Sequence, residues 1–358
     1  MSSSPSSPTK QHSKRIALVL GGGGLKGFAH IGVLRALSEH GIEPVVIAGT
    51  SIGALIGAAY AAGVSIGDLA QRAIAVRRRD LFRINHIGMV MERMRNPSIY
   101  LEHPLRALVA SVVPDVRFDE LAHRLLVSTV DLARGTQVIW GLRGLRDVSV
   151  QQAVYASCAL PGFFPPGVVG DRLCVDGGVM DNLPVRIAAH DMDAVIAVDV
   201  GTTDLLHARE IATEGFAAIF MRAASTTMHE LQIHPLQDWD GAPMVLIRPD
   251  LANVGWFDFS QTEFLIQAGY DAATAALRDY TECVTSAGGV FPRRRRRISV
   301  DAAKCVACGL CVSLAPDVMG ITGGAPAYPL QPSVVWSPAD GDFVRHCPTG
   351  AIDVTPDE

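Results

Sequence analysis

Short runs of apolar, β-branched residues alternate with segments of helical periodicity along most of this chain. The runs contain almost no polar positions, which indicates strands buried on both faces and therefore a mainly parallel sheet covered by helices. We expect an α/β fold whose last helix spans about 260–280. Its strands are predicted at Arg15–Leu20, Val45–Ala48, Leu125–Val130, Gln137–Trp140, Ala194–Val200 and Met244–Ile247. Its other helices are predicted to begin near Lys26, Ile52, Leu101, Val150 and Pro184.

The pattern changes near both ends of the chain and predicts four parts. Residues 1–13 are rich in serine and proline and have no apolar core, so we expect a disordered leader rather than a signal peptide. Residues 14–283 form the main domain. Residues 284–297, which contain the sequence AGGVFPRRRRR, are expected to be a basic linker. Residues 298–358 are then a second, small domain.

Composition supports one large core and one small acidic unit. The chain has 358 residues, of which 49% are hydrophobic and only 6% aromatic, so the core must be mostly aliphatic. Residues 301–358 carry seven acidic and two basic side chains, which accounts for the whole net charge of −5. The uncharged stretch Pro44–Gly67 is long enough to span a bilayer. Because it contains five glycines and a proline, a buried strand followed by a buried helix is favoured.

Ser51 lies in Gly49-Thr50-Ser51-Ile52-Gly53, directly after an apolar strand and before a helix rich in alanine and glycine. A nucleophilic serine is typically held in such a strand–turn–helix setting, where the helix dipole favours negative charge. Gly49 and Gly53 allow the turn to close tightly. The string is common by chance in a glycine-rich chain, so its weight comes from the motifs that accompany it.

A glycine cluster, Gly21–Gly27, follows the first predicted strand and has two functional interpretations. Gly22, Gly24 and Gly27 satisfy the dinucleotide fingerprint G-x-G-x-x-G. That fingerprint requires an acidic residue at the end of the second strand, where this chain has Gly49-Thr50-Ser51, so a nucleotide cofactor is disfavoured. The other interpretation is an oxyanion hole, in which glycine N–H groups point at an oxygen that gains negative charge. A tight turn without a ligand is the third possibility.

The serine needs a group that accepts its proton. Histidine is the usual choice, but His30 lies in an apolar helical context that favours a packed helix residue. Asp176 is better placed, because a short apolar strand ends at Asp176-Gly177-Gly178 and the glycines allow close backbone approach. An aspartate in this role needs surroundings that moderate its acidity. A simple Asp-Gly turn is the alternative.

Four motifs carry a family resemblance: Gly22-Gly23-Gly24-Leu25-Lys26-Gly27, Gly49-Thr50-Ser51-Ile52-Gly53, Ala156-Ser157-Cys158-Ala159-Leu160-Pro161-Gly162-Phe163-Phe164-Pro165-Pro166 and Asp176-Gly177-Gly178. In order and rough spacing they resemble the patatin-like phospholipases over about residues 14–283. The resemblance implies a three-layer α/β/α fold and hydrolysis of lipid acyl esters by a serine–aspartate dyad without histidine. Substrate identity varies across this family.

Matching positions imply the roles of individual residues. Ser51 is similar in position to the family's nucleophile and Asp176 to its base. The residues that resemble the oxyanion loop are Gly22, Gly23 and Gly24. The supporting motif positions are Lys26, Gly27, Gly49, Gly53, Gly177 and Gly178, and Asn182 and Pro184 also match the bacterial branch. Many members of the family have arginine where Lys26 stands, and either cation keeps the charge.

Two arginine-rich segments have more than one interpretation. Residues 72–106 contain eight arginines against three acidic residues, with Leu81, Met89, Val90, Met91 and Met94 between them and with Arg93 and Arg95 as central cations. This mixture suits a mobile lid that touches an anionic lipid surface, and a peripheral helix is the alternative. The run Arg293–Arg297 suits anionic lipid or nucleic acid. Because no aromatic platform surrounds it, a solvated linker fits at least as well and nucleic acid is not expected.

Cys305, Cys308 and Cys311 are followed at a distance by Cys347-Pro348. Three thiolates at this spacing wrap one cubane cluster, and a remote Cys-Pro closes its fourth iron. Two-cluster ferredoxins have a further Cys-Pro where this chain has Ala315-Pro316, so one cluster is expected. The tail resembles single-cluster bacterial ferredoxins, which implies a small α+β domain with a [4Fe-4S] centre, or a [3Fe-4S] form after loss of a labile iron. Structural zinc is the alternative, although zinc sites more often pair two separated C-x2-C knuckles.

The sequence therefore favours a serine acyl-ester hydrolase, acting on phospholipid, lysophospholipid or another fatty acyl ester, with an appended iron–sulfur domain. The cluster regulates the hydrolase, carries electrons to a redox partner or holds structure, and the sequence leaves these open. The rivals are an electron-transfer protein whose body only docks on lipid or a partner, and a flavin- or nicotinamide-dependent oxidoreductase. The remaining cysteines, Cys158, Cys174 and Cys283, are scattered, which favours a reducing, cytoplasmic location, with peripheral membrane contact as an option.

Overall fold

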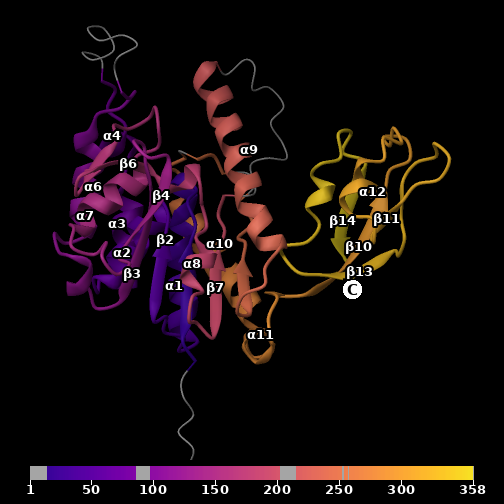
Figure 1. Ribbon diagram of the computed structural model, residues 1–358, viewed down its shortest axis with the longest axis horizontal. Coiled ribbons are helices and arrows are strands. Elements are labelled where there is room, and N and C mark those ends of the chain that lie inside the picture. Colours follow the sequence, from indigo (N-terminus) through magenta and orange to yellow (C-terminus); the bar gives the residue numbers. More distant parts are fainter. Residues whose placement is uncertain (1–13, 86–96, 202–214, 252–253, 257, 358) are drawn as a thin grey trace, which may run out of the picture.

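The structure is a computed structural model that describes residues 14–85, 97–201, 215–251, 254–256 and 258–357. A large sheet with helices on both faces makes up the body, and a smaller C-terminal domain lies beside it (Figure 1). Helix α9 (Phe216–Gln237) stands between the two. The predicted leader, residues 1–13, lies outside the described residues.

The body is built on a nine-stranded sheet whose centre is parallel. In spatial order its strands are β5 (Gly167–Val169), β6 (Arg172–Asp176), β3 (Arg124–Asp131), β2 (Val46–Gly49), β1 (Ile16–Leu20), β7 (Ala194–Val198), β8 (Met244–Ile247) and β9 (Val290–Phe291), with β4 (Thr136–Trp140) also paired to β3. All pairs from β3 to β9 along this order are parallel, whereas β4 and β6 run antiparallel to β3. The predicted α/β class is confirmed.

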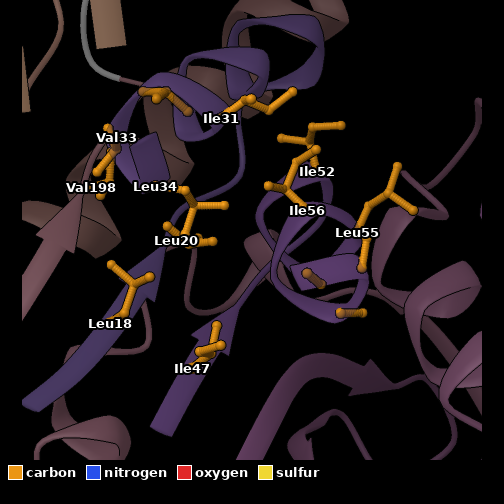
Figure 2. Packing of buried hydrophobic residues seen from close by; sticks show 14 of the residues in the cluster. Leu18, Leu20, Ile31, Val33, Leu34, Ile47, Ile52, Leu55, Ile56 and Val198 are labelled. Carbon is orange, nitrogen blue, oxygen red and sulfur yellow. The ribbon is translucent and has the colours of Figure 1, made fainter. Parts of the chain in front are cut away.

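Alternating side chains of β1 divide the interior into two cores, one on each face of the sheet. Leu18 and Leu20 point into the larger core, part of which Figure 2 shows. Ala17 and Val19 point into the second core, which α8 (Val185–Ala188) and α9 cover. The two covered faces give the three layers that the family resemblance implies. The helices that pack on the larger core include α1 (Ala29–Glu39), α2 (Ile52–Ala61), α7 (Val150–Cys158) and α10 (Thr262–Leu277).

Helix α9 has no counterpart among the predicted elements. Its 22 residues do not show one apolar face. Ile233 and Leu236 pack into the second core, whereas Ile219 and Leu231 are exposed. Helical periodicity is a weak signal in a helix whose sides meet different surroundings. The other helices are α3 (Ile66–Ala75), α4 (Arg78–Leu81), α6 (Glu102–Val112), α11 (Tyr280–Thr285) and α12 (Leu310–Leu314).

The uncharged stretch 44–67 divides into β2 and α2, as predicted. Every residue of α2 except Tyr60 is buried, so its apolar character serves the core of the body. Within the described ranges, no helix combines the length and the apolar character that crossing a bilayer requires.

The C-terminal domain has a small sheet and a core of its own. Strand β10 (Arg294–Val300) lies between β13 (Ser333–Trp336) and β14 (Ile352–Pro356), and both pairs are antiparallel. The domain also contains a separate antiparallel pair, β11 (Met319–Gly320) and β12 (Tyr328–Pro329). Six buried residues form the core: Ile298, Cys311, Met319, Ala327, Phe343 and Ile352. A core of this size contributes little stability by apolar burial alone.

Residues 284–297 differ from the predicted linker, because most of them form regular structure. Strand β9 extends the edge of the large sheet parallel to β8, and β10 starts only three residues later. The backbone of the arginine run pairs with β13 on one side and β14 on the other, so the run forms a strand. Its side chains point away from the backbone bonds and reach solvent or acidic partners. Arg294 forms an ion pair with Asp279 of the body, and Arg297 pairs with Asp357.

Candidate active site

Ser51 occupies the sharp turn between β2 and α2. Its backbone angles, φ 54° and ψ −126°, lie outside the regions that serine ordinarily adopts. Gly53 makes the turn possible, because a Cβ atom there would lie 2.1 Å from the carbonyl oxygen of Leu20. Gly49 is similarly enclosed, since its Cβ would lie 2.6 Å from the Gly53 carbonyl. The turn thus holds the Ser51 side chain at the N-terminus of α2.

Asp176 ends β6 and meets Ser51. The pairing of β6 with β3 sets Asp176 opposite Thr129. The Gly178 N–H donates a hydrogen bond to the Asp176 carboxylate at 2.8 Å. Ser51 and Asp176 line the same cavity, and the Ser51 hydroxyl is close enough to lower the pKa of the Asp176 carboxyl. Asp176 is only 2% exposed. Burial raises the pKa of Asp176 to about 6, although the Gly178 N–H and the Ser51 hydroxyl act in the opposite direction. The carboxylate is therefore ionised at neutral pH and is a better proton acceptor than an exposed aspartate.

The glycine loop borders Ser51, and the structure corrects one of its three predicted donors. The Gly22 N–H donates a hydrogen bond to the backbone carbonyl oxygen of Asn182 at 3.2 Å, so it is not available to a substrate oxyanion. The N–H groups of Gly23 and Gly24 meet no acceptor in the described part of the chain, and both residues line the cavity that contains Ser51. The partner of Gly22 is 160 residues away, and no local motif indicates that contact.

Two buried side chains hold this loop. His30 Nε2 lies 2.8 Å from the carbonyl oxygen of Gly21. Burial lowers the pKa of His30 to about 4, so the neutral ring donates this hydrogen bond. Asn182 brackets Gly22, because its carbonyl accepts from the Gly22 N–H while its Nδ2 donates to the Gly22 carbonyl at 3.1 Å. His30 is thus the packed helix residue that the sequence predicts, with a positioning contact that the sequence does not reveal.

Ser157 fixes the backbone of Ser51. Its Oγ accepts the Ser51 N–H at 2.9 Å and donates to the carbonyl oxygen of Ser128 at 2.7 Å. The Ala156–Pro166 motif marks this region of the sequence but assigns Ser157 no contact. The remaining motif positions are buried and closely packed, and they are Lys26, Gly27, Gly177 and Gly178.

A cavity of about 90 Å³ contains the Ser51 side chain. Cys158 also lines it, and burial, assisted by the nearby Asp176 carboxylate, raises the pKa of the Cys158 thiol well above its usual value. That thiol is therefore un-ionised at neutral pH. The apolar lining suits the part of a hydrocarbon chain that lies next to an ester group. Its walls are mainly Leu25, Phe28, Leu55, Leu105, Leu108, Leu160, Phe164 and Trp256.

The described part of the predicted lid forms one wall of this cavity. Leu81 and Phe82, at the end of α4, line it. Phe82 packs against Tyr100, Phe164 and Phe259. The residues on which the lid prediction mainly depends lie outside the described residues, and they are Met89, Val90, Met91, Arg93, Met94 and Arg95.

The four cysteines of the tail line one cavity of the C-terminal domain, and they are Cys305, Cys308, Cys311 and Cys347. Backbone N–H groups reach two of the sulfur atoms. Ala327 donates to Cys305 Sγ at 3.4 Å, and Ala351 donates to Cys347 Sγ at 3.3 Å. Burial would raise the pKa of the Cys347 thiol, but the backbone donors outweigh it, and the net pKa lies below the usual value. Donors of this kind stabilise a thiolate.

A comparison with protein families matches the part of the chain that contains this site. Residues 18–189 match the family model described as patatin-like phospholipase, so this part is a patatin-like domain. The predicted resemblance is confirmed over that range, which includes Ser51 and Asp176. The match does not extend to the C-terminal domain.

Related proteins match over parts of their length. An uncharacterised NTE-family protein of Mycobacterium tuberculosis is 36% identical over 204 residues, which cover 55% of this chain and 52% of the relative. The lysophospholipase NTE1 of Saccharomyces cerevisiae is 28% identical over 277 residues, which cover 72% of this chain and 16% of the relative. The solved structure of VipD from Legionella pneumophila has a TM-score of 0.38 at 16% identity, covering 73% of this chain and 66% of its own. The chain spans about half the length of its mycobacterial relatives.

Proposed function

We propose that this chain hydrolyses lipid acyl esters through Ser51 and Asp176. The observation that carries the proposal is that a strained serine and a buried carboxylate with a raised pKa line the same apolar cavity. Among the described residues that line this cavity there is no histidine. The dyad therefore works without an imidazole, in agreement with the patatin-like domain that contains it.

In the first half of the reaction, Ser51 Oγ attacks the ester carbonyl carbon while its proton passes to Asp176. The carbonyl π electrons move onto oxygen and form a tetrahedral oxyanion. Collapse of this intermediate breaks the bond to the lipid alcohol, which takes the proton from Asp176, and the acyl group stays on Ser51. A pKa of about 6 suits both transfers, because the carboxylate is free to accept a proton at neutral pH and acidic enough to return it.

The Gly23 and Gly24 N–H groups are the proposed oxyanion donors. A donor of this kind lowers the barrier by about 3–4 kcal/mol, because it acts on charge that develops only in the transition state. His30 and Asn182 hold the loop before substrate arrives. The donors therefore need no rearrangement during the reaction.

In the second half, water attacks the carbonyl carbon of the acyl-enzyme while Asp176 takes a proton from it. The bond between this carbon and Ser51 Oγ then breaks, Asp176 returns the proton to Ser51, and the fatty acid leaves. The apolar cavity accepts the acyl chain and the alcohol group lies outside it. Phospholipids and lysophospholipids are the proposed substrates.

Hydrolysis by the Ser51→Ala variant tests this function. We expect kcat on a lysophospholipid and on a soluble p-nitrophenyl ester to fall at least about 10³-fold, because the dyad acts as a unit. Ser38→Ala is the matched control, since Ser38 is exposed at the end of α1 and should retain the wild-type rate. Equal rates for Ser51→Ala and wild type would contradict the assignment.

We also propose that Cys305, Cys308, Cys311 and Cys347 hold a [4Fe-4S] cluster, with a [3Fe-4S] form after loss of one iron. The spacing of the sulfur atoms supports this over zinc. One tetrahedral zinc ion holds its sulfurs about 3.8 Å apart. Among the described cysteines, no three sulfur atoms lie mutually within 4.8 Å, as a single ion would require. The N–H donors to Cys305 and Cys347 also suit cluster thiolates.

When bound, the cluster supplies one-electron redox chemistry and iron–thiolate bonds that reinforce a small core. Purification under anaerobic conditions tests its presence. We expect about four iron and four sulfide ions per chain, with the visible absorbance and electron paramagnetic resonance of a single cluster. Stoichiometric zinc in place of iron would contradict the proposal.

The arginines beside the cavity suggest contact with an anionic membrane surface. Arg79 is 87% exposed, and Arg78 lies over the ring of Phe82, which lines the cavity. Cations next to an apolar opening attract the anionic headgroups of a membrane, and the acyl chain of a lipid can then enter the cavity. We propose peripheral binding at this edge of the body.

A further inference from the structure

Helix α9 contacts the active site on one side. Met228 lines the Ser51 cavity, and Gln232 Oε1 accepts a hydrogen bond from Asn182 Nδ2 at 3.0 Å. These two residues are four positions apart, so they share one face of the helix. Asn182 in turn brackets Gly22 of the oxyanion loop. The helix therefore supports the loop through one intervening side chain.

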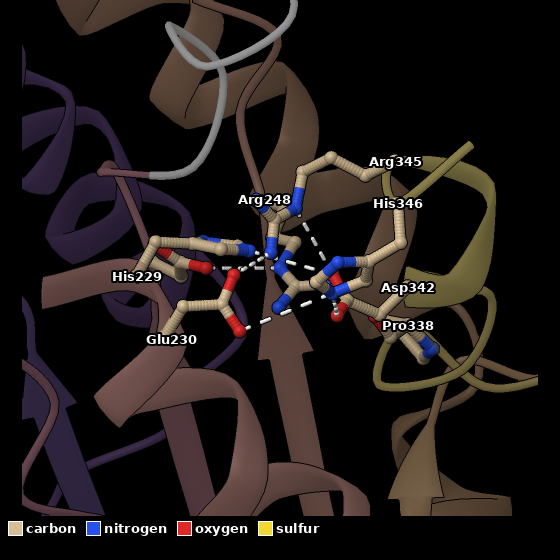
Figure 3. A network of polar contacts seen from close by, with 8 residues as sticks. His229, Glu230, Arg248, Pro338, Asp342, Arg345 and His346 are labelled. Atoms are coloured by element: carbon tan, nitrogen blue, oxygen red, sulfur yellow. Dashed lines mark hydrogen bonds and ion pairs between the residues drawn. The ribbon is translucent and has the colours of Figure 1, made fainter. Parts of the chain in front are cut away.

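The C-terminal domain contacts another side of α9, as Figure 3 shows. The Arg345 guanidinium donates to the carboxylate of Glu230 and, from Nε, to Asp342 at 3.2 Å. Asp342 also lies 3.5 Å from His229 Nε2 and 3.0 Å from His346 Nε2. Residues 229 and 230 belong to α9, and the other three belong to the C-terminal domain.

This network is largely removed from water. The side chains of His229, Asp342 and Arg345 are 7%, 11% and 18% exposed. Burial would raise the pKa of Asp342, but hydrogen bonds from His229 and Arg345 hold it well below its usual value. Glu230, Asp342 and His346 are spaced closely enough for a metal ion, but Arg345 already bonds both carboxylates, so a cation would meet a positive charge. A buried charge that loses its partner is strongly destabilising. These contacts therefore fix the position of the C-terminal domain against α9.

A second connection reaches the same loop. Arg248 donates to the carbonyl oxygen of Pro338 in the C-terminal domain (Figure 3). Its Nε also donates to Asp199 at 2.9 Å. Asp199 directly follows β7. The next residue, Val200, packs against the loop, since a Cβ on Gly23 would lie 2.8 Å from it. Both connections thus run from the C-terminal domain to the proposed oxyanion donors.

We propose that the C-terminal domain positions the oxyanion loop through α9, and that occupancy of its cysteine site controls this positioning. The inference rests on the proposed function, because it explains how a domain with no part in ester chemistry affects the hydrolase. Arg345 and His346 directly precede Cys347, so a ligand held by Cys347 constrains the residues that hold α9. Arg345 and Gln232 touch no substrate and are positioning residues.

The test uses the full chain purified anaerobically, as wild type, Arg345→Gln, Gln232→Leu and the double variant. Hydrogen exchange of peptides covering residues 21–28 is measured beside kcat and KM on a soluble p-nitrophenyl ester. Iron content verifies that each variant keeps its cluster. Arg297→Gln is the matched control, because Arg297 pairs with Asp357 within the C-terminal domain and is 64% exposed.

Both single variants should exchange faster at 21–28, and kcat should fall about tenfold with KM within about twofold, because the donors act on the transition state. The double variant should be no slower than either single one, since both interrupt one connection. Wild type from which iron has been removed should resemble them, and Arg297→Gln should resemble the intact wild type. Folded Arg345→Gln with wild-type exchange at 21–28 would overturn the inference.

If Arg345→Gln does not fold, Glu230→Gln applies the same test from the α9 side and leaves the sequence of the C-terminal domain unchanged. Hydrogen exchange decides the inference independently of ester hydrolysis. A wild-type protein that hydrolyses no ester would therefore overturn the proposed function alone.

Discussion

The body and the C-terminal domain are held together by different physical means. The body has a nine-stranded sheet with an extensive core on each face, and apolar burial is its main source of stability. The C-terminal domain has six buried core residues and four cysteines around one cavity. In our proposal, metal–thiolate bonds reinforce this small core. The proposal thus gives one chain a part that folds by itself and a part whose order depends on a ligand.

The two candidate sites differ in the same way. The cysteines are spaced locally along the sequence, apart from Cys347, and they line one cavity of the small domain. The groups around Ser51 come from distant segments, and packing fixes them in advance, as the contacts of Asn182 with Gly22 illustrate. If the cysteine site holds the proposed cluster, loss of the cluster changes the C-terminal domain without unfolding the body, which is what the proposed regulation requires.

The largest expected effect separates chemistry from stability within the body. Asp176→Asn removes the base, so hydrolysis should fall about 10³-fold while the fold is kept. The same change removes a buried charge, so the free energy of unfolding at pH 8 should rise by up to about 3 kcal/mol. Urea denaturation of both proteins measures this. An inactive and less stable variant would show that Asp176 serves the fold rather than the reaction.

Removal of one cysteine should break the C-terminal domain and leave the body intact. Cys308→Ser should lose the cluster and expose the backbone of residues 298–357, detected as full hydrogen exchange within minutes, because the remaining core is too small to hold the domain. The strands of the body should stay protected. Val335→Ser, a change at a residue that is 60% exposed on β13, is the control. A variant without iron but with wild-type protection in the tail would contradict a structural role for the cluster.

The pH dependence should show the effect of Asp176 burial on both rate and stability. Because the carboxylate must be ionised to act, kcat/KM should rise about tenfold from pH 5 to a plateau above the pKa of about 6. Stability should change in the opposite direction. The native pKa is raised above its unfolded value, so the contribution is fully present below about pH 4 and is lost as pH rises through 6. A rate that does not change between pH 5 and 8 would exclude Asp176 as the base.

The smallest effect is expected at the arginines beside the cavity. Arg78→Glu with Arg79→Glu should weaken binding to vesicles containing phosphatidylserine about tenfold or more, since each basic residue near the surface contributes about 1 kcal/mol. Hydrolysis of a soluble ester should change little. Arg143→Glu with Arg146→Glu makes the same charge change at exposed positions that do not line the cavity. Equal vesicle binding by both pairs would indicate that no particular edge of the body faces the membrane.

Features that depend on local sequence could be predicted, and features that depend on distant contacts could not. The strand ends, the Ser51 turn and Asp176 at the end of its strand follow from apolar runs and glycine spacing. The hydrogen bond from the Gly22 N–H to the Asn182 carbonyl joins residues 160 positions apart, so no local pattern predicts it. The sequence therefore predicts Gly22 as an oxyanion donor, although its N–H is already bonded within the protein. Composition alone also predicts the wrong structure at 284–297, because solvated arginine side chains suit a strand of a small sheet as well as a linker.

The central claim is that Ser51 is activated by Asp176, and labelling with a fluorophosphonate tests it most directly. Intact mass and peptide mapping of the wild-type protein should give one adduct per chain, on Ser51, and Asp176→Asn should be labelled at least about 10³-fold more slowly. A folded wild-type protein without an adduct at Ser51, or equal labelling of the two proteins, would contradict the account.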